Sequence, residues 1–126
     1  MCHVAADFDS FLRLPIREIT VARADLGGEA VYSYVFTRSQ GKSGVPHSAE
    51  IPYVFWHKDD DAWMSRTMED LWGSFARTGV PSAKGIPQWE PYARKSGAVM
   101  SLDHRSYVAH HHDEALLRYI APDRTF

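Results

Sequence analysis

This 126-residue sequence has almost no cysteine, no excess of basic residues and no long apolar run. Its single cysteine, Cys2, cannot form an intramolecular disulfide, and zinc sites built on cysteine pairs are excluded. The 14 Lys and Arg residues are balanced by 16 Asp and Glu, which argues against nucleic acid as a partner. No apolar stretch approaches the ~20 residues needed to cross a bilayer, so no membrane span is expected.

The amino-terminal residues also lack the features of an export signal. Asp7, Asp9, Arg13 and Arg17 interrupt the positions where a signal peptide would have its apolar region. Because any such signal would lie upstream of Met1, a cytoplasmic and an exported location both stay open. Hydrophobic residues make up 44% and aromatic residues 13%, which predicts a packed core within one ordinary domain.

The first half of the sequence predicts one helix and one strand. A helix is expected over residues 9–26, because Pro15 suits a first turn and Gly27 can end a helix. Its apolar residues recur every three or four positions at Ile16, Ile19, Ala22 and Leu26. Residues 31–36, VYSYVF, predict a strand that is apolar enough to be buried on both faces.

The second half contains the clearest helix, over residues 62–78. The aspartates of residues 59–61 can cap its first amides and Gly79 can end it. A core-facing stripe is expected at Met64, Met68, Leu71, Trp72, Phe75 and Ala76. Residues 80–97 are predicted as loop, 98–102 as a short strand and 104–117 as a further helix. Two strands are too few for an independent α/β sheet, so this chain is expected to be part of a larger one.

His47 is the main candidate for chemistry, because it lies in a glycine-containing loop directly after the first predicted strand. In α/β enzymes this edge of the sheet holds the active site, and an imidazole there can act as a general base. A single histidine in a polar loop is more often an ordinary surface residue. The loop position alone does not decide between these interpretations.

The other histidines predict no site. The run His110-His111-His112-Asp113 could offer metal ligands, but adjacent residues of a helix point in different directions. We therefore expect no metal site and no cofactor. His3, His57 and His104 are isolated in the sequence and are expected to be solvated.

Residues 44–55, GVPHSAEIPYVF, resemble the histidine segment of type B carboxylesterases, the family that includes cholinesterases and para-nitrobenzyl esterases. The resemblance continues in the same order on both sides. Upstream it includes Asp9, Pro15 and residues 31–36; downstream it includes residues 64–81, Trp89–Tyr92 and 100–103. Six ordered signals over residues 9–103 make chance similarity implausible.

The resemblance implies an α/β fold, with residues 1–126 forming the carboxyl-terminal fragment of an α/β-hydrolase. The chain would be a single partial domain without an internal boundary, with late sheet strands, a histidine loop and packing helices. By the same resemblance, His47 would be the general base of a Ser-Glu/Asp-His triad. Glu50 would hold the histidine loop by accepting backbone hydrogen bonds.

The sequence departs from the family pattern in what it lacks. No G-x-S-x-G nucleophile motif occurs, and neither the oxyanion-hole glycines nor the acidic triad segment is found. Ser48 also stands where the family has a small Gly or Ala. A base without a nucleophile cannot run an acyl-enzyme cycle, so residues 1–126 alone are expected to be inactive.

The expected partners are therefore those of a longer parent protein. They are a small-molecule ester substrate and the remaining amino-terminal part of the hydrolase sheet. The alternative is a non-catalytic truncated remnant or interaction module, whose open sheet edge pairs with another chain.

Overall fold

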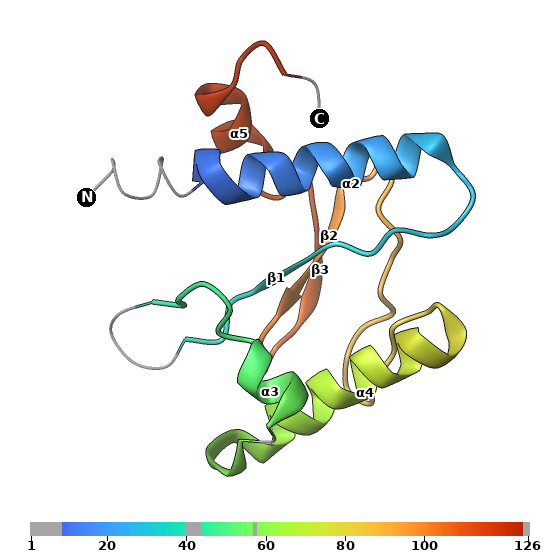
Figure 1. Cartoon of the computed structure of the whole chain (residues 1–126), viewed down its shortest axis with the longest axis vertical. Coiled ribbons are helices and arrows are strands. Elements are labelled where there is room, and N and C mark those ends of the chain that lie inside the picture. Colours follow the sequence, from blue (N-terminus) through green and yellow to red (C-terminus); the bar gives the residue numbers. More distant parts are fainter. Residues whose placement is uncertain (1–8, 40–43, 57, 125–126) are drawn as a thin grey trace. The chain divides into compact units, whose positions relative to one another are not determined.

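The computed structural model describes residues 9–39, 44–56 and 58–124 (Figure 1). In chain order its elements are the π-helix η1 (Asp9–Arg13), α2 (Leu14–Leu26), β1 (Tyr34–Phe36), α3 (Ile51–Phe55), the 3-10 helix η2 (Asp59–Asp61), α4 (Ala62–Thr78), β2 (Ala98–Leu102), β3 (Tyr107–His110) and α5 (Glu114–Ile120). They fall into two compact units. Within the described residues, the first unit contains 9–33, 91–99 and 109–124, and the second contains 34–90 and 100–108.

The three strands form one sheet in the order β1-β2-β3. Strand β1 runs parallel to β2, with Tyr34 opposite Met100 and Phe36 opposite Leu102. Every residue of the central strand β2 is buried, whereas only Phe36 is fully buried in β1. The amide of Thr37 donates to the carbonyl of Leu102 (2.9 Å), which carries the pairing one residue past the end of β1.

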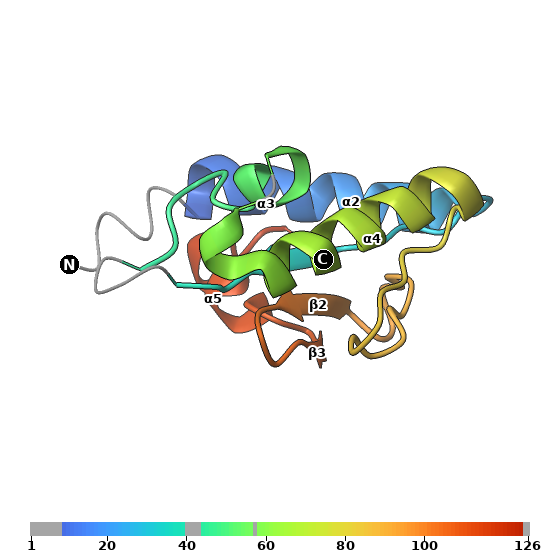
Figure 2. The same ribbon diagram turned by 90° about the horizontal axis from the view of Figure 1, so that it is seen from below.

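In the second unit, α3 and α4 lie side by side, as Figures 1 and 2 both show. The buried apolar side chains come from both helices and from the strands: Phe36, Tyr53, Met64, Met68, Leu71, Trp89, Met100 and Leu102. The rings of Phe36 and Tyr53 are 5.4 Å apart, which joins β1 to α3. This packing joins β1 and α3, the two elements that flank the loop containing His47.

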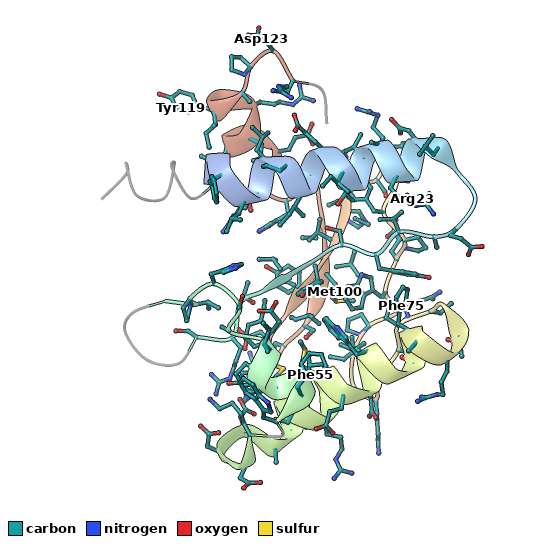
Figure 3. All side chains as sticks on the ribbon, in the orientation of Figure 1. Arg23, Phe55, Phe75, Met100, Tyr119 and Asp123 are labelled. Atoms are coloured by element: carbon teal, nitrogen blue, oxygen red, sulfur yellow. The ribbon has the colours of Figure 1, made fainter. Side chains whose placement is uncertain are left out.

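Helix α4 confirms the predicted bounds and both predicted ends. Its N-cap is Asp61, whose carboxylate accepts a hydrogen bond from the Met64 amide (3.3 Å), and it ends at Gly79 with a φ of 75°. The predicted core stripe is buried at Met64, Met68 and Leu71, but its last residues, Phe75 and Ala76, are exposed. Phe75 is 48% exposed, and Figure 3 shows it on the last part of α4. Trp72 lies between these extremes and is half-buried.

The first unit is built on α2 and α5. Its core contains Val21, Tyr92 and Leu117. The buried face of α2 also includes Arg17, whose guanidinium donates to the His112 carbonyl (2.8 Å). The apolar residues predicted as one stripe lie on the opposite, exposed side: Ile16 is 59%, Ile19 69% and Leu26 77% exposed.

The structure corrects two predicted boundaries near the amino terminus. Residues 9–13 form a π-helix, so the α-helix begins only at Leu14. The strand expected over residues 31–36 is ordered as a strand only at Tyr34–Phe36. Before it, the Val31 carbonyl accepts a hydrogen bond from the Tyr92 amide (2.7 Å), so the start of the apolar run pairs outside the sheet.

The helix predicted over residues 104–117 is wrong. The segment forms strand β3, a turn and then α5. His111 and Asp113 have φ values of 54° and 60°, which a continuous right-handed helix does not allow. Tyr107 and Val108 are residue types that favour strands, so the sheet gains a third strand that the sequence reading missed.

Candidate functional site

His47 begins the turn of residues 47–50, which joins the loop after β1 to helix α3. The side chain of His47 is exposed. Two backbone hydrogen bonds close the turn, from the Ala49 amide to the Pro46 carbonyl (3.3 Å) and from the Ile51 amide to the Ser48 carbonyl (3.2 Å). Ser48 adopts a left-handed φ of 61°. The structure therefore presents an accessible imidazole on a hydrogen-bonded turn after a sheet strand.

Glu50, the last residue of this turn, is tied to β1. Its carboxylate accepts a hydrogen bond from the Tyr34 hydroxyl (3.2 Å). Tyr34 in turn lies edge-on to Trp72 and to Trp89, with ring centroids 5.3 and 6.0 Å away. Burial and the neighbouring Glu50 carboxylate raise the pKa of the Tyr34 phenol, so it remains a proton donor at physiological pH. Glu50 therefore anchors the turn by accepting from the Tyr34 phenol of β1, whereas the sequence predicted that it would accept from backbone amides.

A second anchor lies at Asp61, which sequence reasoning assigned only as a helix cap. Its carboxylate accepts a hydrogen bond from Arg38 Nε (2.8 Å) and contacts His104 Nε2 (2.9 Å). Burial tends to raise the pKa of Asp61, but the hydrogen bonds from Arg38, His104 and the Met64 amide outweigh it and hold that pKa below its ordinary value.

His104 is exposed, as expected, but it is not isolated. Besides its contact with Asp61, its ring lies edge-on to Trp63 at 5.3 Å. The aspartate triplet before α4 signalled a cap, whereas Arg38 and His104 are 23 and 43 positions away from Asp61. No spacing rule connects residues so far apart. His3 and His57 lie outside the described residues.

The histidine run is explained by local pairing. His111 Nδ1 contacts Glu114 (2.5 Å) and His112 Nε2 contacts Asp113 (3.2 Å), while Asp113 also pairs with Arg13. In the described ranges, no group of three or more His, Cys, Asp or Glu side chains is placed to hold a metal ion. None of the helices in those ranges has the length and apolarity to cross a membrane.

Comparison with known proteins decides the family. The model of the Carboxylesterase family matches residues 4–119. This chain belongs to the carboxylesterase family. Among its relatives is acetylcholinesterase of Gallus gallus, 30% identical over 112 residues that cover 77% of this chain and 14% of the relative. Another is a medium-chain fatty acyl-CoA hydrolase precursor of Anas platyrhynchos, 32% identical over 80 residues that cover 52% of this chain and 14% of the relative.

Solved structures give the fold of this carboxylesterase segment. An esterase from the anaerobe Clostridium hathewayi, described as able to hydrolyse aliphatic aromatic polyesters, matches with a TM-score of 0.72 and 28% identity. That match covers 87% of this chain and 24% of the esterase. PNB esterase matches with a TM-score of 0.65 and 23% identity, over 72% of this chain and 21% of the other. The expected α/β-hydrolase architecture is confirmed.

The carboxylesterase segment is short beside its relatives, since it spans between 14% and 24% of their length. This partial coverage fits a fragment of the larger fold. Within it, the structure places His47 and Glu50 on one turn and brings Arg38, Asp61 and His104 together beside α4.

Proposed function

We propose that this chain is the carboxyl-terminal segment of a serine carboxylic-ester hydrolase and that it supplies His47 as the general base of the triad. In this role the imidazole takes the proton from a serine hydroxyl as the serine attacks the ester carbonyl. The imidazolium then returns that proton to the leaving alcohol. The serine, the triad acid and the oxyanion donors would come from the rest of the hydrolase.

The observation that carries this proposal is the position of His47. It combines a family match over the whole histidine segment with an exposed side chain on a turn that follows a sheet strand. A general base must be accessible to the hydroxyl from which it takes a proton, and it must be held in place. The hydrogen bond between Tyr34 and Glu50 supports the second requirement, because it fixes the other end of the turn.

The partner that we propose is the amino-terminal part of the hydrolase sheet. Two features support it. The outer face of α2 exposes Ile16, Ile19 and Leu26, a row of large apolar side chains that a monomeric protein usually covers. In the sheet of the described residues, β1 has a neighbour only on its β2 side, and its residues Tyr34 to Phe36 include no proline or charge that would block further pairing.

The proposal predicts that residues 1–126 alone do not hydrolyse esters by a serine mechanism. Incubation with an activated ester such as p-nitrophenyl acetate should give no burst and no rate above that of free imidazole. A fluorophosphonate probe should label no serine. Burst kinetics together with labelling of Ser43 or Ser48 would contradict the proposal, because the chain would then contain its own nucleophile.

Activity should appear when the missing part is supplied. In a chimaera, the aligned carboxyl-terminal segment of the Clostridium hathewayi esterase is replaced by residues 9–124 of this chain. We expect the chimaera to hydrolyse p-nitrophenyl butyrate, and the same esterase cut before that segment to be inactive. A folded chimaera without turnover would instead favour the non-catalytic alternative.

A further inference from the structure

The segment that contains His47 is attached at both of its ends to the same unit of the protein. Its outgoing end leaves β1 at Thr37 and reaches Arg38, which donates to Asp61 at the start of α4. Its returning end contains Glu50, which accepts from Tyr34 of β1. Each end of the segment that contains His47 is therefore held by a side-chain contact, Arg38 with Asp61 at one end and Glu50 with Tyr34 at the other.

The contact at the outgoing end is charged and partly buried. The Asp61 side chain is only 8% exposed, and that of Arg38 is 32% exposed. Hydrogen bonds between charged groups are shorter and stronger than neutral ones, and their strength increases as water is excluded. Arg38 also donates through its NH1 group to the Ser39 carbonyl (3.0 Å), so the same guanidinium holds the backbone at the first residue of the segment.

A capping role alone does not account for this arrangement. Asp61 Oδ1 accepts from the Met64 amide (3.3 Å), which satisfies the helix start. Its other oxygen, Oδ2, accepts a hydrogen bond from Arg38, which follows β1 in the chain. His104, which follows β2, contacts both oxygens. A serine or asparagine would cap the helix equally well, so the charge at this position serves the contacts with Arg38 and His104.

We propose that Asp61 is a positioning residue for His47, acting through Arg38 to hold the outgoing end of the histidine segment against α4. The meaning of this role for catalysis rests on the proposed function of His47. The positioning itself does not, because the segment can be held whether or not the imidazole acts as a base.

The test separates positioning from capping with four variants of the full chain. Asp61→Asn keeps an oxygen for the Met64 amide and removes the charge. Arg38→Gln removes the charged guanidinium and leaves the cap untouched, and the double variant combines both changes. Asp59→Asn is the matched control, since it removes the same charge from an exposed residue of the same 3-10 helix.

Two measurements report on the histidine segment. Hydrogen exchange gives the protection of the Ala49 and Ile51 amides, which close the turn, and of the α4 amides as a reference. NMR gives the ring signal of His47 and its titration midpoint, assigned with His47→Gln. We expect Asp61→Asn and Arg38→Gln each to speed exchange at the turn about tenfold or more, the loss expected for one charged hydrogen bond. Both should shift the His47 signal, while α4 keeps its protection.

The double variant should exchange no faster than the faster single variant, because both changes break one contact. Asp59→Asn should leave the turn and the His47 signal unchanged. Several results would overturn the proposal: an unchanged turn in Arg38→Gln, an equal loss of protection in the turn and in α4, or turn amides that already exchange at unprotected rates in the parent chain. Because no ester is used, these results are distinct from a failure of the proposed function.

Discussion

Two carboxylates, Glu50 and Asp61, make polar contacts at the two ends of the segment that contains His47. Glu50 accepts from the Tyr34 hydroxyl, and Asp61 accepts from Arg38 and contacts His104. Glu50 was predicted to anchor the loop through backbone amides, but its partner is the Tyr34 hydroxyl. Asp61 could be predicted as a cap from its position before α4, whereas its long-range partners depend on how the ends of β1 and β2 lie in the folded unit.

The low pKa of Asp61 makes the second unit sensitive to acid. A carboxyl whose pKa is lowered by folding stabilises the protein fully above its unfolded value of about 3.9, and this contribution is lost as the pH falls through the lower folded value. We expect protection of the Ala49 and Ile51 amides, which close the histidine turn, to fall over this range in the parent chain. Asp61→Asn should remove that step, whereas Asp59→Asn should retain it. Hydrogen exchange corrected for intrinsic rates between pH 5 and 2 checks this expectation.

Gly97 illustrates a close approach that only glycine permits. Its φ is 56°, and a Cβ there would lie 2.7 Å from His111 Nδ1 and 2.8 Å from the His111 amide nitrogen. Gly97→Ala should therefore cost the ~1–2 kcal/mol of a left-handed alanine and about 1–3 kcal/mol more for the collision. Gly27→Ala is the control, since its φ is 69° but nothing lies within 4 Å.

Hydrogen exchange of the Leu117 amide in α5 reports the loss of stability in both glycine variants, because all three residues belong to the first unit. This amide donates to the Asp113 carbonyl (2.9 Å), close to the turn that Gly97 contacts. Equal effects of the two substitutions would mean that the approach of His111 to Gly97 contributes nothing to stability.

At the scale of elements, the sequence predicts well where signals are local and repeated. Helix α4 has a cap, a three- to four-residue apolar period and a terminal glycine, and its bounds were predicted correctly. Helix α5 is only seven residues long, and β3 is four. Such short segments contain too few periods to distinguish a strand and a turn from a helix, and the left-handed residues His111 and Asp113 are not glycines. The burial of the α4 stripe was overestimated because spacing shows which residues share a face but not how far the neighbouring structure covers it.

Two aromatic residues of α4 test how far its core face extends. Trp72 is half-buried and lies edge-on to Tyr34, whereas Phe75 is nearly half exposed. Trp72→Ala should lower the stability of α4 by about 2–3 kcal/mol, less than the ~3–5 kcal/mol of a fully buried aromatic. Phe75→Ala should cost less than about 1 kcal/mol. Protection of the Leu71 amide against exchange compares the two variants, and a larger loss in Phe75→Ala would contradict the assigned core face.

At the scale of the whole molecule, the described residues leave large apolar side chains exposed. The exposed side of α2 contains Ile16, Ile19 and Leu26, and the chain spans 21% and 24% of the two esterase structures compared above. The spacing of these residues predicted a stripe correctly, but no pattern within this sequence could show that the described residues leave it exposed.

This surface should make the isolated chain associate or bind a hydrophobic dye such as ANS, and unfold without a sharp transition. The double variant Ile16→Lys/Ile19→Lys should reduce dye binding and association, because it places charge on the open face of α2. Glu29→Lys, outside that helix, controls for the added positive charge. A sharp two-state melt of a monomer that binds no dye would show that residues 1–126 form a self-sufficient domain.

The central claim is that His47 acts as the base of an ester hydrolase, and one comparison tests it most directly. In the active chimaera described above, kcat/KM for p-nitrophenyl butyrate is measured with His47→Ala and with His110→Ala, a second exposed histidine. The account predicts that His47→Ala lowers kcat/KM by about 10³-fold or more, while His110→Ala stays within about twofold of the parent. Retention of activity in folded His47→Ala would contradict it.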